Sequence, residues 1–357
     1  MAGGNRTRRA VLKLGVQALL AGSALAILPA RSASADQDVS GSGAHKTYLG
    51  QIMPPPRPFG RAIQAGIIVR DVPAVKAREV RRLAWNEVVP LLGQTIGDGP
   101  TTYNPVWYQM PDGYAHSGFL QPCEHILNAP VDLPEGSLCW GEITVPIAEA
   151  RAQPDPNARL RYRYYYGCVF QVIARTTDAE GNPWYQIHDE NLGNGFFVRA
   201  ENMRIIDPAE FEPISPDVLP TEKRIEVDLS QQMIRAFERN ELVYEARAAT
   251  GAAGTRTTPG EHRILRKTPS RHMTGGSGSG YYDLPGIGWC TYFTQSGIAI
   301  HGTYWHNDYG RPRSHGCVNL LPEHAKWFFR WTTPVAPYTQ RWTRPAQSNE
   351  PSVVVVF

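Results

Sequence analysis

Several features that mark common functional classes are missing from this sequence. No two cysteines have the CxxC spacing of a zinc site, and no glycine-rich loop has a phosphate-binding pattern. The formal net charge of +3 is small for 357 residues, so we expect no nucleic-acid partner. We therefore expect a globular protein that works without a metal, a nucleotide or another cofactor.

Long apolar runs are also scarce. The one such stretch near the N-terminus, residues 14–28, is too short for a stable membrane span. Basic residues precede it, including the pair Arg8-Arg9, and a small-residue cleavage site, Ala33-Ser34-Ala35, follows it. Residues 1–35 thus resemble a signal peptide of the twin-arginine type, the alternative being an ordinary secretory signal. We expect export to the cell envelope, either periplasm or cell wall, with membrane attachment only if the signal stays uncleaved.

Cysteine is rare, and the chain has five. If Cys317 stays free, the other four allow three disulfide pairings, and the sequence does not choose among them. All four fit buried thiols equally well. The four are Cys123, Cys139, Cys168 and Cys290.

Residues 36–60 are rich in Gly, Ser and Pro, which predicts an extended tether. A repeated pattern of short strands follows, with Trp107-Tyr108-Gln109 in the first copy and Trp184-Tyr185-Gln186 in the second. Each copy resembles a bacterial SH3-like β-barrel, over residues 61–125 and 138–208. One larger β-domain with a chance repeat is the alternative. Such modules bind peptides or cell wall, or act as spacers, and fold alone does not decide between these roles.

A proline-marked segment, residues 209–221, predicts a separable linker before a C-terminal domain over residues 222–340, with residues 341–357 as a final segment. Alternating apolar residues predict strands over residues 224–229 and 233–238, and a third strand beginning at Leu242. Helical spacing appears over residues 322–331. We therefore predict a mainly β protein with one short helix outside the signal.

The most informative residues are Ser314-His315-Gly316-Cys317-Val318. The reactive form of cysteine is the thiolate, so a nucleophilic Cys317 needs an imidazole to take its proton. His301 and His315 are both candidates for this base. Gly316 lets the backbone approach a substrate closely, so that main-chain N–H groups can face an oxyanion.

Together with His301-Gly302 upstream and Asn319 downstream, this string closely resembles the signature of the L,D-transpeptidase catalytic domain family. The resemblance covers residues 222–340 and implies a β-sandwich-like catalytic fold. It favours His301 as the base, with its other ring nitrogen held by a carbonyl near Gly302. It leaves His315 to shape an oxyanion pocket with the Gly316 and Cys317 amides.

Other residues near the signature have two interpretations each. Ser314 and Asn319 either orient the site or make local turn hydrogen bonds. Arg313 is a candidate for binding a stem-peptide carboxylate. Tyr304 and Trp305 either line a peptide groove or pack in the core.

A zinc-thiolate site built with His306 and His324 is the competing interpretation of this histidine cluster, but its spacing matches no zinc pattern.

The resemblance implies peptidoglycan L,D-transpeptidation through a Cys317 thioester, with peptidoglycan stem peptides as partners and carbapenem β-lactams as covalent inhibitors. Hydrolysis by an L,D-carboxypeptidase, exchange of a free D-amino acid and anchoring of an envelope protein are alternatives that differ in the acceptor. A non-enzymatic cell-wall binding protein is the remaining alternative, which the intact His301, His315 and Cys317 disfavour.

Overall fold

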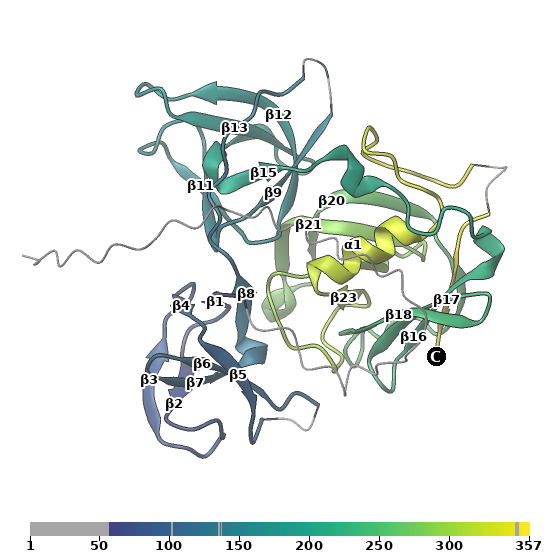
Figure 1. The fold of residues 1–357 in the computed structure, drawn as a ribbon, viewed down its shortest axis with the longest axis horizontal. Coiled ribbons are helices and arrows are strands. Elements are labelled where there is room, and N and C mark those ends of the chain that lie inside the picture. The colour runs from purple at the N-terminus through teal and green to yellow at the C-terminus, as the bar shows by residue number, and fades with distance from the viewer. Residues whose placement is uncertain (1–56, 101–102, 135, 137, 347–349) are drawn as a thin grey trace, which may run out of the picture. The chain divides into compact units, whose positions relative to one another are not determined.

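The computed structural model describes residues 57–100, 103–134, 136, 138–346 and 350–357, and its fold is mainly β, as predicted (Figure 1). The expected signal peptide and most of the expected tether lie outside these residues. In the described part of the chain, no helix has the length and apolar character that crossing a membrane requires.

The first group of strands, here called the N-module, runs from Phe59 to Cys123. Its strands form a three-stranded sheet in the order β4-β1-β8 and a five-stranded sheet in the order β3-β2-β7-β6-β5, around a small apolar core of their own. The elements are β1 (Phe59–Ala62), β2 (Ile67–Arg70), β3 (Glu79–Leu83), β4 (Val88–Pro90), β5 (Gly93–Ile96), β6 (Val106–Met110), β7 (Gly113–His116), the 3₁₀ turn Ser117–Phe119 and β8 (Leu120–Cys123).

The second group, here called the M-module, runs from Cys139 to Ile205 and forms one seven-stranded sheet in the order β11-β10-β14-β13-β12-β9-β15. Its elements are β9 (Cys139–Ile143), β10 (Ile147–Arg151), β11 (Leu160–Tyr165), β12 (Val169–Thr177), β13 (Pro183–Asp189), β14 (Gly193–Arg199), the 3₁₀ turn Ala200–Asn202 and β15 (Met203–Ile205).

The two modules pair their strands in the same way. The first strand pairs with the last in each (β1 with β8, β9 with β15), and the WYQ strands β6 and β13 occupy equivalent places. A 3₁₀ turn precedes the last strand in both. The main difference is that β4 and β5 of the N-module correspond to the single long strand β12. The SH3-like assignment of these modules stays a prediction.

The C-terminal region contains two sheets and the one α-helix of the described chain. A five-stranded sheet has the order β18-β17-β16-β24-β19, and a four-stranded sheet has the order β20-β21-β22-β23. The strands are β16 (Lys223–Asp228), β17 (Met233–Glu238), β18 (Glu241–Arg247), β19 (Gly260–Arg263), β20 (Arg266–Gly275), β21 (Tyr282–Tyr292), β22 (Ala299–Gly302), β23 (Val318–Leu320) and β24 (Val353–Val356). Short 3₁₀ turns lie at Pro208–Phe211, Pro220–Glu222 and Gly278–Gly280.

Helix α1 (Pro322–Trp331) lies over the four-stranded sheet and contacts β21 and β22 (Figure 1). Proline is tolerated in the first turn because its missing N–H has no partner there anyway. The buried side chains of Ala325, Phe328 and Phe329 recur at helical spacing and pack into the core between the two sheets. The predicted helix over 322–331 is confirmed, and so are the strands expected over 224–229 and 233–238.

The C-terminal region shares its cores with the M-module. Trp140 and Val169 of the M-module pack into the core of the two-sheet region, while Ile287 and Tyr292 of β21 pack into the core of the M-module. The Ser270 hydroxyl on β20 also donates to the Val169 carbonyl. These two parts therefore form one continuous apolar interior.

The segment 209–221 differs from the expected separable linker. It begins within the 3₁₀ turn Pro208–Phe211, and the Phe211 ring is buried against Trp289 at 5.3 Å and Phe329 at 6.1 Å between ring centroids. Proline content predicted an extended segment, but one buried aromatic side chain fixes it to the core.

All five cysteines are free thiols, and Cys123, Cys139, Cys168 and Cys290 are buried. Of the two interpretations that the sequence left open, the structure selects buried thiols.

Candidate active site

Cys317 and His301 come from two neighbouring parallel strands. In the β22–β23 pair, His301 lies opposite Asn319, so both side chains are on one face of the sheet. Cys317 comes just before β23 and two residues before Asn319, and side chains two apart along an extended chain point the same way. The backbone N–H of Ala299, two residues before His301, also bonds the Cys317 sulfur. Cys317 and His301 thus lie on one face of the sheet, and the Cys317 thiol donates to the Gly297 carbonyl at 3.9 Å.

The orientation of His301 is fixed by its own neighbour. Nδ1 lies 3.0 Å from the carbonyl oxygen of Gly302, so Nδ1 carries the proton and donates it there. Nε2 is then left with a lone pair that can accept a proton. Gly302 is a close-packed position, because a Cβ there would meet the Cα of Pro322 at 3.1 Å.

Burial keeps both groups neutral in the free protein. It lowers the pKa of His301 to about 4, against the opposing effect of the hydrogen bond to Gly302. It raises the pKa of the Cys317 thiol to about 11, while the bond from Ala299 acts the other way. At pH 7 the pair is therefore a thiol beside a neutral imidazole, and the thiolate forms only as its proton moves to the imidazole.

A short turn presents Cys317. The Ser314 hydroxyl donates to the Cys317 carbonyl at 2.5 Å and accepts from the Gly316 N–H at 3.0 Å. Gly316 has φ +123°, a conformation that residues with a Cβ rarely adopt. The Gly316 amide is thus occupied by Ser314, which argues against its expected role as an oxyanion donor.

Sequence reasoning missed the segment that holds this turn, residues 249–257. The buried Thr257 hydroxyl donates to the Gly316 carbonyl at 2.7 Å and accepts from the Gly251 N–H at 2.9 Å. The Thr250 carbonyl accepts the N–H groups of Arg313 and Ser314 at 2.7 and 3.0 Å. Nothing local in the sequence marks this support, because Thr257 reaches the Gly316 carbonyl only in the folded chain.

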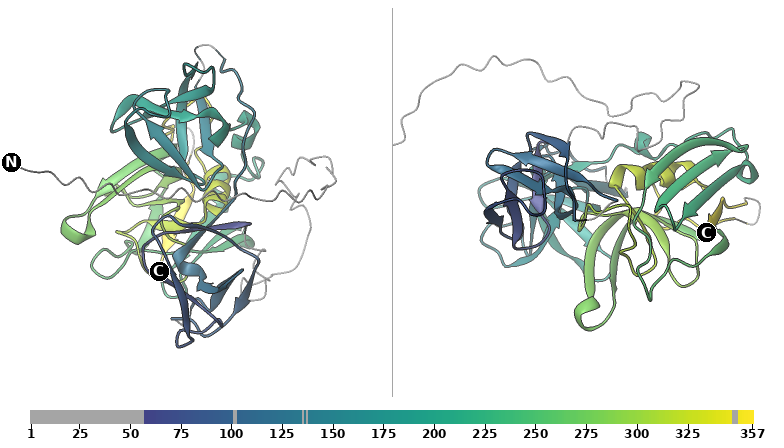
Figure 2. Two further views of the ribbon diagram at one scale, coloured as in Figure 1. Left: turned by 90° about the vertical axis from the view of Figure 1, so that its left-hand side faces the viewer. Right: turned by 90° about the horizontal axis from the view of Figure 1, so that it is seen from below.

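The structure places His315 at the surface, and its expected part in an oxyanion pocket stays a prediction. Its side chain is exposed, and its ring lies 5.0 Å from the ring of Tyr282, at the start of β21. The tip of the β20–β21 hairpin, which carries Tyr282, projects from its sheet (Figure 2). His315 therefore faces this hairpin at the surface, whereas His301 is the buried imidazole on the thiol's face of the sheet.

Arg313 already has a carboxylate partner. Its guanidinium donates to Asp308 at 3.1 Å, and Arg311 also lies 2.7 Å from the same buried carboxylate oxygen. The Arg313 side chain is therefore anchored within the loop between β22 and β23, and its binding of a stem-peptide carboxylate stays a prediction.

Asn319 and His306 form a buried pair beside His301. The His306 Nδ1 accepts the Asp308 N–H at 3.4 Å, and burial lowers the pKa of His306 well below its usual value, so the single ring proton sits on Nε2. The Asn319 amide lies 2.9 Å from this Nε2 and must accept its proton. The amide oxygen, not the NH₂ group, therefore faces His306. The NH₂ group then occupies the amide position that has no partner among the described residues. Asn319 thus places a hydrogen-bond donor on the face that carries His301 and Cys317.

Tyr304 and Trp305 both line a cavity, and Tyr304 also packs in the core. The Tyr304 ring is buried and its hydroxyl donates to the Pro285 carbonyl at 2.9 Å, which is core packing. The partly exposed Trp305 lies 5.8 Å from the His301 ring, measured between centroids, and lines a cavity. The N-module braces this loop, because the Asn307 amide donates to the Tyr108 hydroxyl at 3.0 Å and to the Ser117 carbonyl at 3.2 Å.

Within the part of the chain that the structure describes, no group of three His, Cys, Asp or Glu side chains is arranged to hold a metal. His324, one residue of the competing zinc interpretation, instead lies 2.6 Å from the Tyr244 hydroxyl.

A protein-family model supports the resemblance. The model of the YkuD family, described as the L,D-transpeptidase catalytic domain, matches residues 222–346. This range agrees with the expected 222–340, and it contains Cys317, His301 and every other predicted site residue. Residues 1–221 lie outside the match. No curated protein matches the chain.

Solved structures give weaker likenesses. A mutant of the Enterococcus faecium L,D-transpeptidase is 23% identical, over 38% of this chain and 50% of that one, with a TM-score of 0.31. The chain thus covers half the length of that protein. The catalytic domain of the E. faecium enzyme acylated by ertapenem is 23% identical, over 38% of this chain and 98% of that one, with a TM-score of 0.29. The L,D-transpeptidase from Mycobacterium smegmatis is 15% identical, over 75% and 99%, with a TM-score of 0.32. TM-scores this low do not establish a shared overall fold.

Proposed function

We propose that this protein is an exported peptidoglycan L,D-transpeptidase that acts through a thioester on Cys317. The observation that carries the proposal is the placement of Cys317 and His301 on one sheet face, with the His301 Nδ1 held by the Gly302 carbonyl. The family match over residues 222–346 supports the same chemistry.

In the first half-reaction, the Cys317 sulfur attacks the carbonyl carbon of the third residue of a tetrapeptide stem. The thiol proton moves to the His301 Nε2 as the C–S bond forms. The C–N bond to the terminal D-alanine then breaks, and the same proton passes from the imidazole to the departing amine. The products are free D-alanine and a thioester on Cys317.

In the second half-reaction, the side-chain amine of a diamino acid on a neighbouring stem attacks the thioester. His301 takes a proton from this amine and returns it to the sulfur, which restores the thiol. The energy of the cleaved peptide bond is retained in the thioester, so the reaction requires no nucleotide or metal. Water at the same position would make the protein an L,D-carboxypeptidase.

Carbapenems would acylate Cys317 by the same attack, because their strained lactam carbonyl can take the place of the donor carbonyl. The N-module and the M-module belong in this proposal as accessory parts that bind cell wall or position the substrate. The twin-arginine-type segment would deliver the folded protein to the cell envelope.

Product analysis tests this function. The full-length protein is incubated with purified disaccharide-tetrapeptides, and the products are identified by mass spectrometry. Cross-linked dimers together with free D-alanine are expected. Tripeptides with no dimers would assign a carboxypeptidase instead, and unchanged tetrapeptides would contradict both activities.

A further inference from the structure

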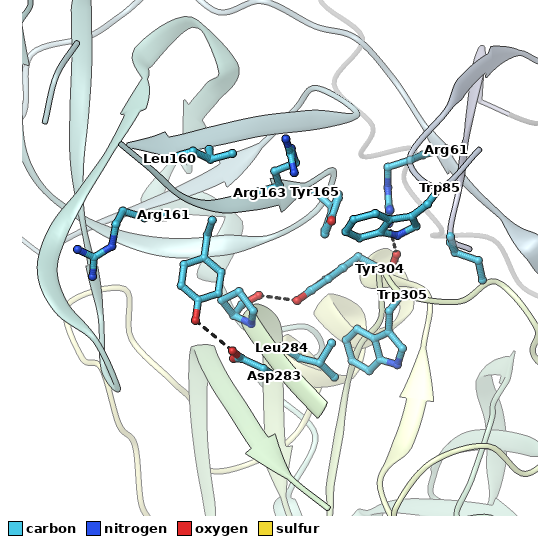
Figure 3. A pocket seen from close by; sticks show the side chains of 13 residues that line it. Arg61, Trp85, Leu160, Arg161, Arg163, Tyr165, Asp283, Leu284, Tyr304 and Trp305 are labelled. Carbon is cyan, nitrogen blue, oxygen red and sulfur yellow. Dashed lines mark hydrogen bonds between the residues drawn. The ribbon is translucent and has the colours of Figure 1, made fainter. Parts of the chain in front are cut away.

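A cavity of about 440 Å³ lies where the N-module, the M-module and the C-terminal region meet (Figure 3). Trp85 of the N-module, strand β11 of the M-module and Trp305 of the loop between β22 and β23 contribute to its lining. The family match begins at residue 222, so much of this lining lies outside the matched domain. No role described above uses the cavity.

One arginine fixes the walls of the cavity. The nearly fully buried Arg61 donates to the Tyr304 carbonyl at 2.8 Å and to the Gln121 amide oxygen at 2.7 and 2.9 Å. Its guanidinium carbon also lies 3.7 Å from the centroid of the Tyr165 ring on β11. A single side chain thus ties all three parts together, so the cavity is preformed.

Two further arginines bring positive charge. Arg161 and Arg163 are two apart on β11, both are exposed there and both line the cavity. Neither makes a salt bridge to any residue that the structure describes, although Arg163 lies opposite Glu149 of β10. The guanidinium of Arg161 lies over the ring of Phe196, at 5.3 Å. The acidic residue in the lining, Asp283, is already bonded to the Tyr162 hydroxyl at 3.0 Å and to His272. The cavity therefore has free guanidinium groups, which pair well with carboxylates.

Aromatic faces complete the lining. The side chain of Trp85 is 56% exposed, unusual for an indole with no role, and Trp305 lies within the same cavity (Figure 3). Flat aromatic surfaces bury the apolar faces of sugars and peptide side chains while leaving their polar edges in water. The combination fits a ligand that is both anionic and partly apolar.

The cavity also lies one side chain away from His301, although neither His301 nor Cys317 lines it. The Trp305 ring that lines it lies 5.8 Å from the His301 ring, so an occupant would extend to within one side chain of the imidazole.

We propose that this cavity is a subsite for a sugar-linked stem peptide of peptidoglycan, with stem carboxylates at Arg161 and Arg163 and a sugar ring on Trp85. The inference rests on the proposed function, because the stem it binds is a segment of the polymer that reacts at Cys317. Donor and acceptor strands both carry such a stem, and the test distinguishes which of them occupies the cavity.

Binding without turnover tests the subsite itself. A disaccharide-tripeptide lacks the D-alanine that leaves, so its affinity for the full-length protein can be measured by calorimetry. The double variant Arg161→Gln/Arg163→Gln should bind it roughly tenfold more weakly, since each substitution removes a charge-assisted contact. Trp85→Ala should also weaken binding. Arg159→Gln is the matched control, because Arg159 is exposed and adjacent to β11 but does not line the cavity.

Half-reaction kinetics then identify the strand. A raised KM for D-alanine release in the double variant would place the donor in the cavity. A raised KM for the acceptor, with unchanged D-alanine release, would place the acceptor there. Acylation by a small carbapenem should keep its wild-type rate in either case.

Equal tripeptide affinity in the wild type, the double variant and Trp85→Ala would overturn the subsite. So would an equal loss of affinity in Arg159→Gln. Failure of the proposed function has a different signature, namely a wild-type protein that releases no D-alanine from tetrapeptides.

Discussion

At the scale of single residues, the Cys317 thiol and the His301 imidazole are each kept neutral by burial. A thiol with a pKa of about 11 is ionised in only roughly one molecule in 10⁴ at pH 7. The site therefore stores no reactive thiolate. In the proposed reaction, the thiolate forms only as C–S bond formation accompanies proton transfer, and the neutral thiol resists oxidation in the meantime.

Alkylation by iodoacetamide tests this description. Because the thiol pKa is raised, the thiolate fraction grows about tenfold per pH unit until pH approaches the pKa. The alkylation rate at Cys317 should therefore rise steadily from pH 6 to pH 9. Cys317→Ala gives the background from the four buried thiols. A rate that levels off between pH 6 and pH 8 would indicate a preformed thiolate–imidazolium pair and contradict the account.

Gly316 is the residue whose backbone conformation the site depends on most. Gly316→Ala adds a Cβ at φ +123°, 3.3 Å from the Ile298 side chain. We expect a loss of ~1–3 kcal/mol in the free energy of unfolding. We expect the resulting displacement of Cys317 to raise the activation barrier for carbapenem acylation by about 1.4 kcal/mol or more. Acylation should then slow by about tenfold or more.

Gly195→Ala is the matched control, since a Cβ at that glycine meets nothing within 4 Å. Unfolding is followed by denaturant titration and acylation by intact-protein mass. Wild-type values for both in Gly316→Ala would show that the turn tolerates a side chain.

At the scale of elements, the β20–β21 hairpin is clamped to the M-module by His272. The buried His272 imidazole bonds Asp189 of β13 through Nδ1, at 2.8 Å, and Asp283 of β21 through Nε2. The Tyr162 hydroxyl also bonds Asp283, and Glu190 accepts the His272 N–H at 2.8 Å. Two carboxylates on one imidazole favour its charged form, so the clamp is an ionic link between strands far apart in the chain.

This clamp predicts a dependence of stability on pH. Burial opposes the charge of His272, but the hydrogen bonds to Asp189 and Asp283 outweigh it, so the pKa is raised above its usual 6.5. Because the pKa is higher in the folded state, protonated His272 stabilises the fold fully below about pH 6.5. That stabilisation is lost as pH rises through the folded-state pKa. The contribution of His272 to the free energy of unfolding should therefore fall as pH rises from 6 to 9.

His272→Gln should remove most of that fall, whereas His125→Gln, which changes an exposed histidine, should leave it. Urea titrations at each pH provide the measurement. Parallel pH profiles for the wild type and His272→Gln would rule out the clamp as its source.

At the scale of the whole molecule, the accessory modules and the C-terminal region depend on each other. The M-module shares two apolar cores with the C-terminal sheets, and the N-module holds the loop between β22 and β23 through Asn307 and Arg61. The sequence predicts a separable catalytic domain because its linker is rich in proline, but packing across modules leaves no trace in local composition.

A chain beginning near Pro220 tests this dependence. The sequence alone favours a shortened protein that still reacts with a small lactam. The structure predicts that it loses cooperative unfolding and reacts with carbapenem much more slowly, because Ile287, Tyr292 and Trp289 would lose apolar neighbours. Arg61→Met in the full chain keeps both modules and removes the tie to Tyr304, so it should slow acylation while the protein stays folded. A wild-type rate in both variants would contradict the proposed bracing.

The features that the sequence predicted depend on residues close together in the chain. Most of those it missed depend on contacts between distant residues. The nucleophile, its imidazole and helix α1 depend on motifs and spacings that are local. Thr257 supports Gly316 from 59 residues away, through a hydrogen bond that only the folded sheet creates. The pairing of Arg313 with Asp308 is nearer in sequence, but charge alone does not tell a substrate contact from an internal ion pair. The sequence explains Gly316 by close approach to a substrate, whereas the structure shows a φ of +123° and an amide bonded to Ser314.

The central claim is that Cys317 carries the stem peptide as a thioester, and a quenched reaction examines it directly. The full-length protein is mixed with disaccharide-tetrapeptide, stopped in acid and mapped by mass spectrometry. The account predicts an adduct on Cys317 equal to the substrate without its D-alanine, and no adduct or D-alanine release with Cys317→Ala. An adduct on Cys290 or Cys168, or D-alanine released by the Cys317→Ala protein, would contradict it.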